Sequence, residues 1–99
     1  MENKLENKLN RSIGNFSAFT KVVHCNFCFR ECSTLVHIAQ ENNCKITLAS
    51  GSKKGDTSSV LSLMKLGIVA DTPVIFTITG ENQSRTYHQI IELFDNGWQ

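Results

Sequence analysis

The chain has 99 residues, of which 40% are hydrophobic and 19% are charged, and its formal net charge at pH 7 is +1. This composition is typical of one small globular domain, and so small a charge gives no argument for binding nucleic acid or a membrane surface. No apolar run is long enough to span a membrane, and the polar N-terminus lacks the core of a signal peptide. We therefore expect a cytoplasmic protein without membrane insertion, in which the four cysteines are reduced thiols.

Residues 1–17 are expected to form a polar extension outside the folded domain. The tetrapeptide Glu-Asn-Lys-Leu at 2–5 repeats at 6–9, which would place Leu5 and Leu9 on one face of a helix. A helix this short and polar is marginal on its own. Two interpretations stay open, namely a disordered extension and a helix that docks on this domain or on a partner.

The first strand is expected over Phe19–His24, where Lys21 interrupts the alternation of apolar and polar residues. Its register stays open, because a slip of one residue would exchange the two faces of the strand. After a loop through Cys25 and Asn26, a helix is expected over 29–40. Its buried face is predicted from the helical spacing of Phe29, Cys32, Val36 and Ala39.

Two strands are expected over 45–50 and 53–56, joined by a tight turn at Gly51-Ser52. A further strand over 74–79 has the strictest alternation in the chain and follows a turn at 71–73. A last helix begins after 80–82, and its apolar residues recur at i, i+3, i+4 and i+7, namely Tyr87, Ile90, Ile91 and Phe94.

A short helix is expected within residues 58–68, because the sequence marks both of its ends. Four residues suited to capping a helix N-terminus precede it, namely Asp56, Thr57, Ser58 and Ser59. Apolar residues at helical spacing follow, namely Val60, Leu61, Leu63, Met64 and Leu66. Gly67 then permits the left-handed turn that stops a helix.

The expected order of elements is therefore β-α-β-β-α-β-α, which suits an α+β fold with helices on one face of an antiparallel sheet. We expect the core to contain the residues whose alternation in a strand, or spacing in a helix, places them between the sheet and the helices. They are Phe19, Val36, Ile46, Leu48, Leu63, Leu66, Val74, Phe76, Ile78, Ile90 and Phe94.

The segment from Ser59 through Leu-Met-Lys-Leu-Gly-Ile at 63–68 resembles the regulatory-serine segment of the histidine-containing phosphocarrier protein family, HPr. The resemblance runs without gaps from about Phe19 to Phe94 and does not cover the extension. It implies an HPr-like domain over residues 18–97, an open-faced β-sandwich whose four-stranded antiparallel sheet is covered on one face by three helices. It also implies an apolar, inward residue where this chain has Lys21.

In HPr a histidine before the first helix carries the phosphoryl group, within the motif Gly-x-His-x-Arg-Pro-Ala. Residues 26–32 match this motif, and Arg30 keeps the arginine, but Asn26 replaces the glycine and Glu31 the proline. Cys28 stands in place of the histidine. His24 and His37 do not match the motif, so the resemblance implies a family member that cannot carry phosphohistidine.

Two other uses of the thiols stay open. Cys28 could itself carry the phosphoryl group, since a helix N-terminus and Arg30 both favour an anion, although Glu31 opposes one. Alternatively Cys25, Cys28 and Cys32, beside His24, could form a thiol redox or metal-binding module. Without a second Cys/His pair we predict no metal and no cofactor.

Ser59 aligns with the serine that HPr kinase/phosphorylase phosphorylates in many Gram-positive bacteria, and Ser58 competes for the same roles. A predicted protein-binding surface contains Phe29, Val60, Leu61 and Met64. The resulting hypothesis is a bacterial regulatory protein of sugar transport and catabolite repression. Its expected partners are the kinase, a transcription regulator or metabolic enzyme, and enzymes of the phosphotransferase system.

Overall fold

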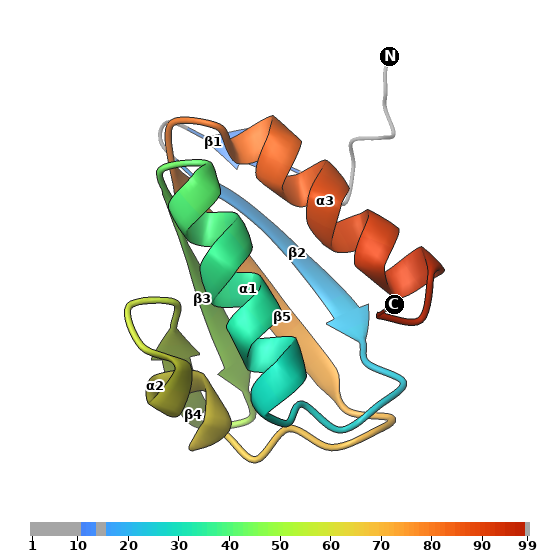
Figure 1. Cartoon of the computed structure of the whole chain (residues 1–99). Coiled ribbons are helices and arrows are strands. Elements are labelled where there is room, and N and C mark those ends of the chain that lie inside the picture. Colours follow the sequence, from blue (N-terminus) through green and yellow to red (C-terminus); the bar gives the residue numbers. More distant parts are fainter. Residues whose placement is uncertain (1–10, 14–15, 99) are drawn as a thin grey trace.

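The computed structural model describes residues 11–13 and 16–98 (Figure 1). Five strands form one antiparallel sheet in the order β1-β2-β5-β3-β4. Three helices accompany it. In chain order the elements are β1 (Arg11–Ile13), β2 (Phe16–Val22), α1 (Phe29–Glu41), β3 (Cys44–Ser50), β4 (Lys53–Asp56), α2 (Val60–Met64), β5 (Pro73–Gly80) and α3 (Gln83–Asp95).

The helices lie on one face of the sheet, with α1 and α3 side by side across it and α2 beside β4 (Figure 1). This arrangement confirms the expected open-faced sandwich, in which β2, β5, β3 and β4 are the four expected strands. Strand β1 is an addition at the edge, and it lies within the stretch assigned to the extension. The proposed helix carrying Leu5 and Leu9 lies outside the described residues.

Strand β2 begins and ends earlier than expected, yet its register agrees with the implied inward position of Lys21. Phe19 and Val23 are buried on either side of it, and Phe19 pairs with Phe76 of β5. The Lys21 side chain is only partly buried, and its ammonium lies 5.5 Å from the centre of the Phe94 ring. No slip of the strand is therefore needed to place this lysine.

Nine of the eleven expected core residues are buried, while Val36 and Phe94 are partly buried against the core. The prediction for Phe29 as a buried helix residue is wrong, because 63% of its surface is exposed. At 3.6 residues per turn, the buried face of α1 centres on Leu35 and includes Cys32 and Ile38. Phe29 lies beyond the edge of that face.

Helix α2 is shorter than the stretch that the sequence predicted. Ser59 is its N-cap and Lys65 its C-cap, and the next two N–H groups, of Leu66 and Gly67, donate to carbonyls three residues back. Such bonds satisfy carbonyls at the end of a helix. Gly67, with φ +61°, then redirects the chain. No helix within the described ranges is long and apolar enough to cross a membrane.

A series of ring contacts connects the sheet with the loop before α1. Phe76 of β5 stacks on Phe19 at 5.0 Å between ring centres and meets Phe94 edge-on at 5.8 Å. Trp98 contacts Phe94 at 5.4 Å and Phe27 at 5.0 Å. Because Phe27 directly precedes Cys28, this aromatic core helps to position the start of α1.

Candidate functional site

The loop before α1 is held by the segment that connects α2 to β5. The Phe27 N–H donates to the Ile68 carbonyl at 2.9 Å, and the Val23 N–H donates to Thr72 at 3.0 Å. The side-chain oxygen of Asn26 accepts from the Ala70 N–H at 2.9 Å. Asn26 therefore has a structural role at the position where the resemblance implies glycine.

Cys28 is the N-cap of α1, with extended backbone angles of φ −94° and ψ −165°. Its side chain is exposed. The first N–H groups of a helix lack partners within the helix and attract anions, so this is a position at which a phosphoryl group could be bound. Arg30, whose side chain is 69% exposed, lies in the same first turn.

The carboxylate of Glu31 accepts hydrogen bonds at this helix end. One of its oxygens accepts from the Cys28 N–H at 3.0 Å. The other accepts from Arg30, at 3.3 Å from Nε and 3.0 Å from Nη2. Glu31 is only 5% exposed, so a nearly buried anion lies at the start of this helix.

Burial alone would raise the pKa of the Glu31 carboxyl. Hydrogen bonds from its own backbone N–H, from Arg30 and from Cys28 outweigh burial and lower that pKa overall. The carboxylate is therefore charged at neutral pH and repels a second anion at the same helix end.

All four cysteines are free thiols. Burial raises the pKa of Cys32 to about 11, and its Sγ lies 3.9 Å from the Phe27 carbonyl oxygen. Burial and the Glu31 charge also raise the pKa of Cys25. Because the thiolate is the reactive form, neither thiol is activated.

The structure does not assemble a metal site around these thiols. Within residues 11–13 and 16–98, no three His, Cys, Asp or Glu side chains are grouped closely enough to hold a metal ion. The two histidines considered from the sequence, His24 and His37, are both exposed. His37 lies 3.2 Å from Glu41 on the outer surface of α1.

The second region of interest is the start of α2. The Ser59 hydroxyl accepts from the Ser62 N–H at 3.3 Å, which makes Ser59 the N-cap among the four candidate residues. Ser58 instead bonds to the Asp56 carboxylate through its hydroxyl and its N–H. These bonds lower the pKa of Asp56. Both serines are exposed.

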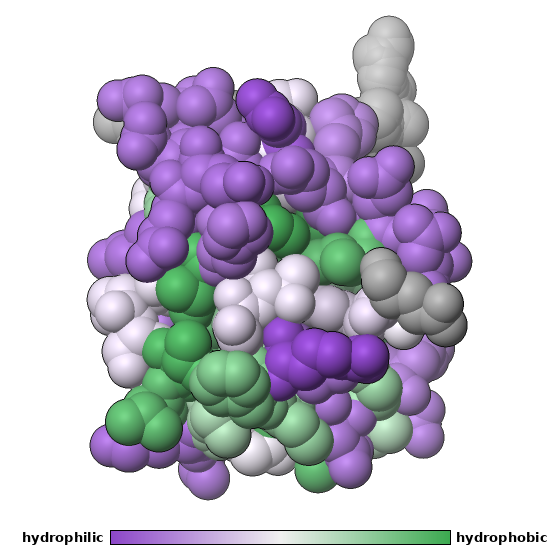
Figure 2. All heavy atoms as spheres, in the orientation of Figure 1, coloured by the Kyte–Doolittle hydropathy of each residue, from purple (hydrophilic) through white to green (hydrophobic). Residues whose placement is uncertain are grey.

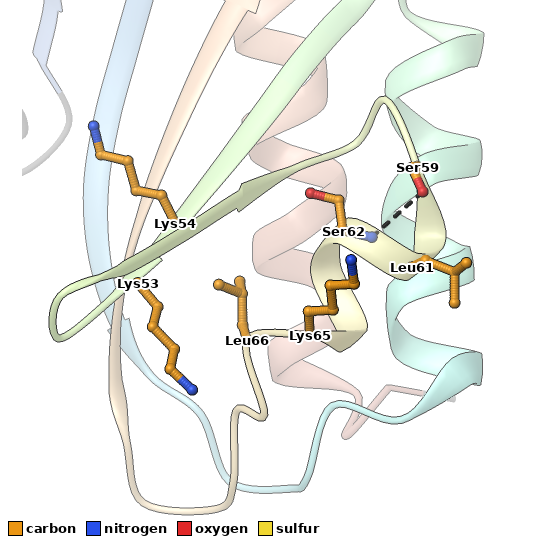
Figure 3. Close-up of a pocket in the computed structure, with 7 residues that line it drawn as sticks. All are labelled: Lys53, Lys54, Ser59, Leu61, Ser62, Lys65 and Leu66. Carbon is orange, nitrogen blue, oxygen red and sulfur yellow. Dashed lines mark hydrogen bonds between the residues drawn. The ribbon is translucent and has the colours of Figure 1, made fainter.

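A pocket of about 510 Å³ opens between β4 and α2 (Figure 3). In this view the Lys65 ammonium points back toward the start of α2, whereas Lys53 and Lys54 extend from β4 in opposite directions, Lys54 away from α2. No local sequence pattern predicts these lysines as part of a site, since only folding brings β4 beside α2. The pocket is lined by Lys53, Lys54, Ser59, Leu61, Ser62, Lys65 and Leu66.

Hydrophobic side chains gather beside this pocket, over α2 and the start of α1 (Figure 2). Leu61 is 67% exposed and Met64 37%, and Phe29 also belongs to this group. Val60 is partly buried against the core. The four residues of the predicted binding surface therefore include three large exposed apolar side chains.

Together, the antiparallel sheet and the helices on one of its faces define the class of small α+β open-faced sandwiches. A sequence model described as "PTS HPr component phosphorylation site" matches residues 27–96, which is more than half of the chain. The chain belongs to the PTS-HPr family. It has the HPr-like phosphocarrier fold of the phosphotransferase system.

Solved structures agree with this assignment at the level of the fold. HPr-C-His from Thermoanaerobacter tengcongensis is 17% identical with a TM-score of 0.71, and the match covers 82% of this chain and 93% of that one. The histidine-containing phosphocarrier protein of Mycoplasma is 20% identical with a TM-score of 0.71, with 80% and 93% covered. No curated protein sequence matches the chain.

Proposed function

We propose that this chain is a cytoplasmic, bacterial HPr-like protein that does not carry phosphohistidine and acts by docking on other proteins. The observation that carries this proposal is the cap of α1, where Cys28 is the N-cap and Glu31 accepts its N–H. A phosphocarrier needs a nucleophile at this position and free donors for the transferred group. Here the Glu31 carboxylate accepts from the Cys28 N–H and from the Arg30 side chain, and the exposed side chain is a thiol.

The surface formed by Phe29, Val60, Leu61 and Met64 supports the docking role. Large apolar side chains that gather in one exposed patch commonly mark an interaction site. The lysines of the neighbouring pocket add positive charge at its rim, which favours an acidic partner. Within this proposal, the partner is a transcription regulator, a metabolic enzyme or a phosphotransferase-system enzyme.

Regulation by phosphorylation at Ser59 is the second part of the proposal. Ser59 is exposed and lies in the same pocket as Lys53, Lys54 and Lys65. A phosphate on Ser59 would add about two negative charges there, and these lysines would compensate part of them. The switch would thus change the charge of the docking surface without requiring a change of fold.

The first test is phosphoryl transfer from phosphoenolpyruvate by the first enzyme of the phosphotransferase system, followed by intact mass measurement. An HPr that has the active-site histidine serves as the positive control, and Cys28→Ser as the matched variant. We expect no phosphorylated product. A stoichiometric product that depends on Cys28, survives acid and is released by iodine would contradict the proposal and identify a cysteine phosphocarrier.

The second test is incubation with HPr kinase and ATP, followed by mapping of the modified residue. We expect modification of the wild type and of Ser58→Ala, and none of Ser59→Ala. Modification at Ser58, or none on the wild-type chain, would leave Ser59 as a capping residue only.

A further inference from the structure

We propose that the pocket between β4 and α2 binds a small molecule with two anionic groups, of the diphosphate or bisphosphate class. Its lining includes three lysines and no acidic residue. The whole chain has ten basic and nine acidic residues, so three lysines without an acid in one pocket are a local excess of charge.

These lysines are available to a ligand. In the part of the chain that the structure describes, Lys53, Lys54 and Lys65 have neither an ion-pair partner nor a hydrogen-bond acceptor. A second surface pocket differs, because Glu92 and Asp95 lie beside Arg85 on α3. Of these two pockets, the one beside α2 has charge of a single sign, which selects for anions.

The two hydroxyl groups of the pocket are also available as donors. The Ser59 oxygen accepts from the Ser62 N–H at 3.3 Å, and the Ser62 oxygen accepts from the Asp56 N–H at 3.2 Å. A serine hydroxyl that accepts a hydrogen bond still has its own proton to donate. Both serines can therefore donate to ligand oxygens without losing the bonds that hold α2.

The positive charges come from opposite walls, which is why we infer two anionic groups. Lys53 belongs to β4 and Lys65 follows α2, while Lys54 points away from α2 (Figure 3). Leu66 lies between Lys53 and Lys65 in this view, and Leu61 adds a further apolar side chain to the lining. A ligand with two charged ends can contact both walls at once, whereas a single phosphate contacts one wall or leaves the other uncompensated.

The site does not depend on the proposed regulation of Ser59, although the two would interact. A phosphate on Ser59 and a bound anion would compete for the same lysines, so each should weaken the other. The test below uses unphosphorylated protein, so its outcome is separate from the outcome of the kinase experiment.

The experiment is a titration of the full chain, labelled with ¹⁵N, with pyrophosphate and in parallel with inorganic phosphate. Salt at about 0.15 M limits nonspecific attraction between exposed charges. We expect saturable shifts concentrated on the amides of the pocket residues, with a dissociation constant on the order of 1 mM for pyrophosphate. Phosphate should bind several-fold more weakly.

The double variant Lys53→Gln/Lys65→Gln removes one charge from each wall, and Lys45→Gln/Arg85→Gln is its control. The control makes the same change of charge at exposed residues outside the pocket. We expect the pocket variant to bind pyrophosphate at least about fivefold more weakly and the control to bind as the wild type does. Shifts that do not saturate, equal losses in both variants, or equal affinity for phosphate and pyrophosphate would overturn the proposal.

Discussion

The backbone N–H of Cys28 donates to the Glu31 carboxylate at 3.0 Å, so the first turn of α1 is closed by its own third residue. The same carboxylate holds the Arg30 guanidinium. The sequence suggests Glu31 only as a charge that repels an anion, whereas in the structure its carboxylate accepts a hydrogen bond at this helix end. The negative charge at the start of α1 therefore comes from the chain itself.

Replacing Glu31 with alanine should lower the free energy of unfolding at pH 7 by about 1–2 kcal/mol, because the Cys28 N–H and the Arg30 side chain each lose a bond to its carboxylate. Glu31→Gln keeps an acceptor but loses the charge, so it should cost less. Urea denaturation measures both. Glu92→Gln, an exposed change on α3, is the control and should be nearly neutral.

The pH dependence of this effect has a defined sign. The folded pKa of Glu31 lies below its ordinary value of 4.5, so the charge contributes stability at pH values above about 4.5. That contribution is lost as the pH falls through the folded pKa. The stability difference between wild type and Glu31→Gln should therefore shrink in acid, and a difference that stays constant would contradict this assignment.

Phe76→Ala should cost about 3–5 kcal/mol, because Phe76 is fully buried between Phe19 and Phe94. Ile75→Ala is the matched control on the same strand. Its side chain is 49% exposed on the open face, so its cost should be much smaller. Denaturation midpoints that are similar for the two variants would show that the faces of β5 are assigned wrongly.

Periodicity predicts the parts of this fold that are regular over several residues. The alternation in β5 identifies Val74, Phe76 and Ile78 as core residues, and all three are fully buried. Single positions at the ends of elements are harder to assign, as the exposed Phe29 shows. Trp98 was missed because its burial depends on contacts with Phe27, more than seventy residues away in sequence.

The candidate site could be predicted only in part, because some of its residues meet only in the folded chain. The resemblance directs attention to Cys28 and Ser59, which the structure places at two helix N-caps. The capping role of Glu31 could have been found, since Cys28-x-x-Glu31 has the spacing of a capping box, although cysteine is not a usual first residue. The lysines of the pocket have no local signal, because β4 and α2 meet only in the folded chain.

Ser59→Ala should lower the free energy of unfolding by about 1 kcal/mol, since the Ser62 N–H loses its acceptor. Ser58→Ala is the matched control, because that exposed hydroxyl bonds only to the Asp56 carboxylate among the described residues. Thermal or urea denaturation of both variants measures the difference. A larger loss of stability in Ser58→Ala than in Ser59→Ala would show that Ser58 is the N-cap.

The last prediction concerns Lys21, whose backbone occupies an inward position on β2 between the buried residues Phe19 and Val23. Lys21→Leu should raise the free energy of unfolding by about 1 kcal/mol. Leucine would bury apolar surface against the helices without having to extend a charge toward solvent, and this gain should exceed the loss of the contact with Phe94. Lys45→Leu is the control, because Lys45 is exposed on β3. This change should raise the free energy of unfolding only slightly. If Lys21→Leu shifts the urea midpoint downward with an unchanged slope, then the ammonium–ring contact outweighs burial and the lysine stabilises this fold.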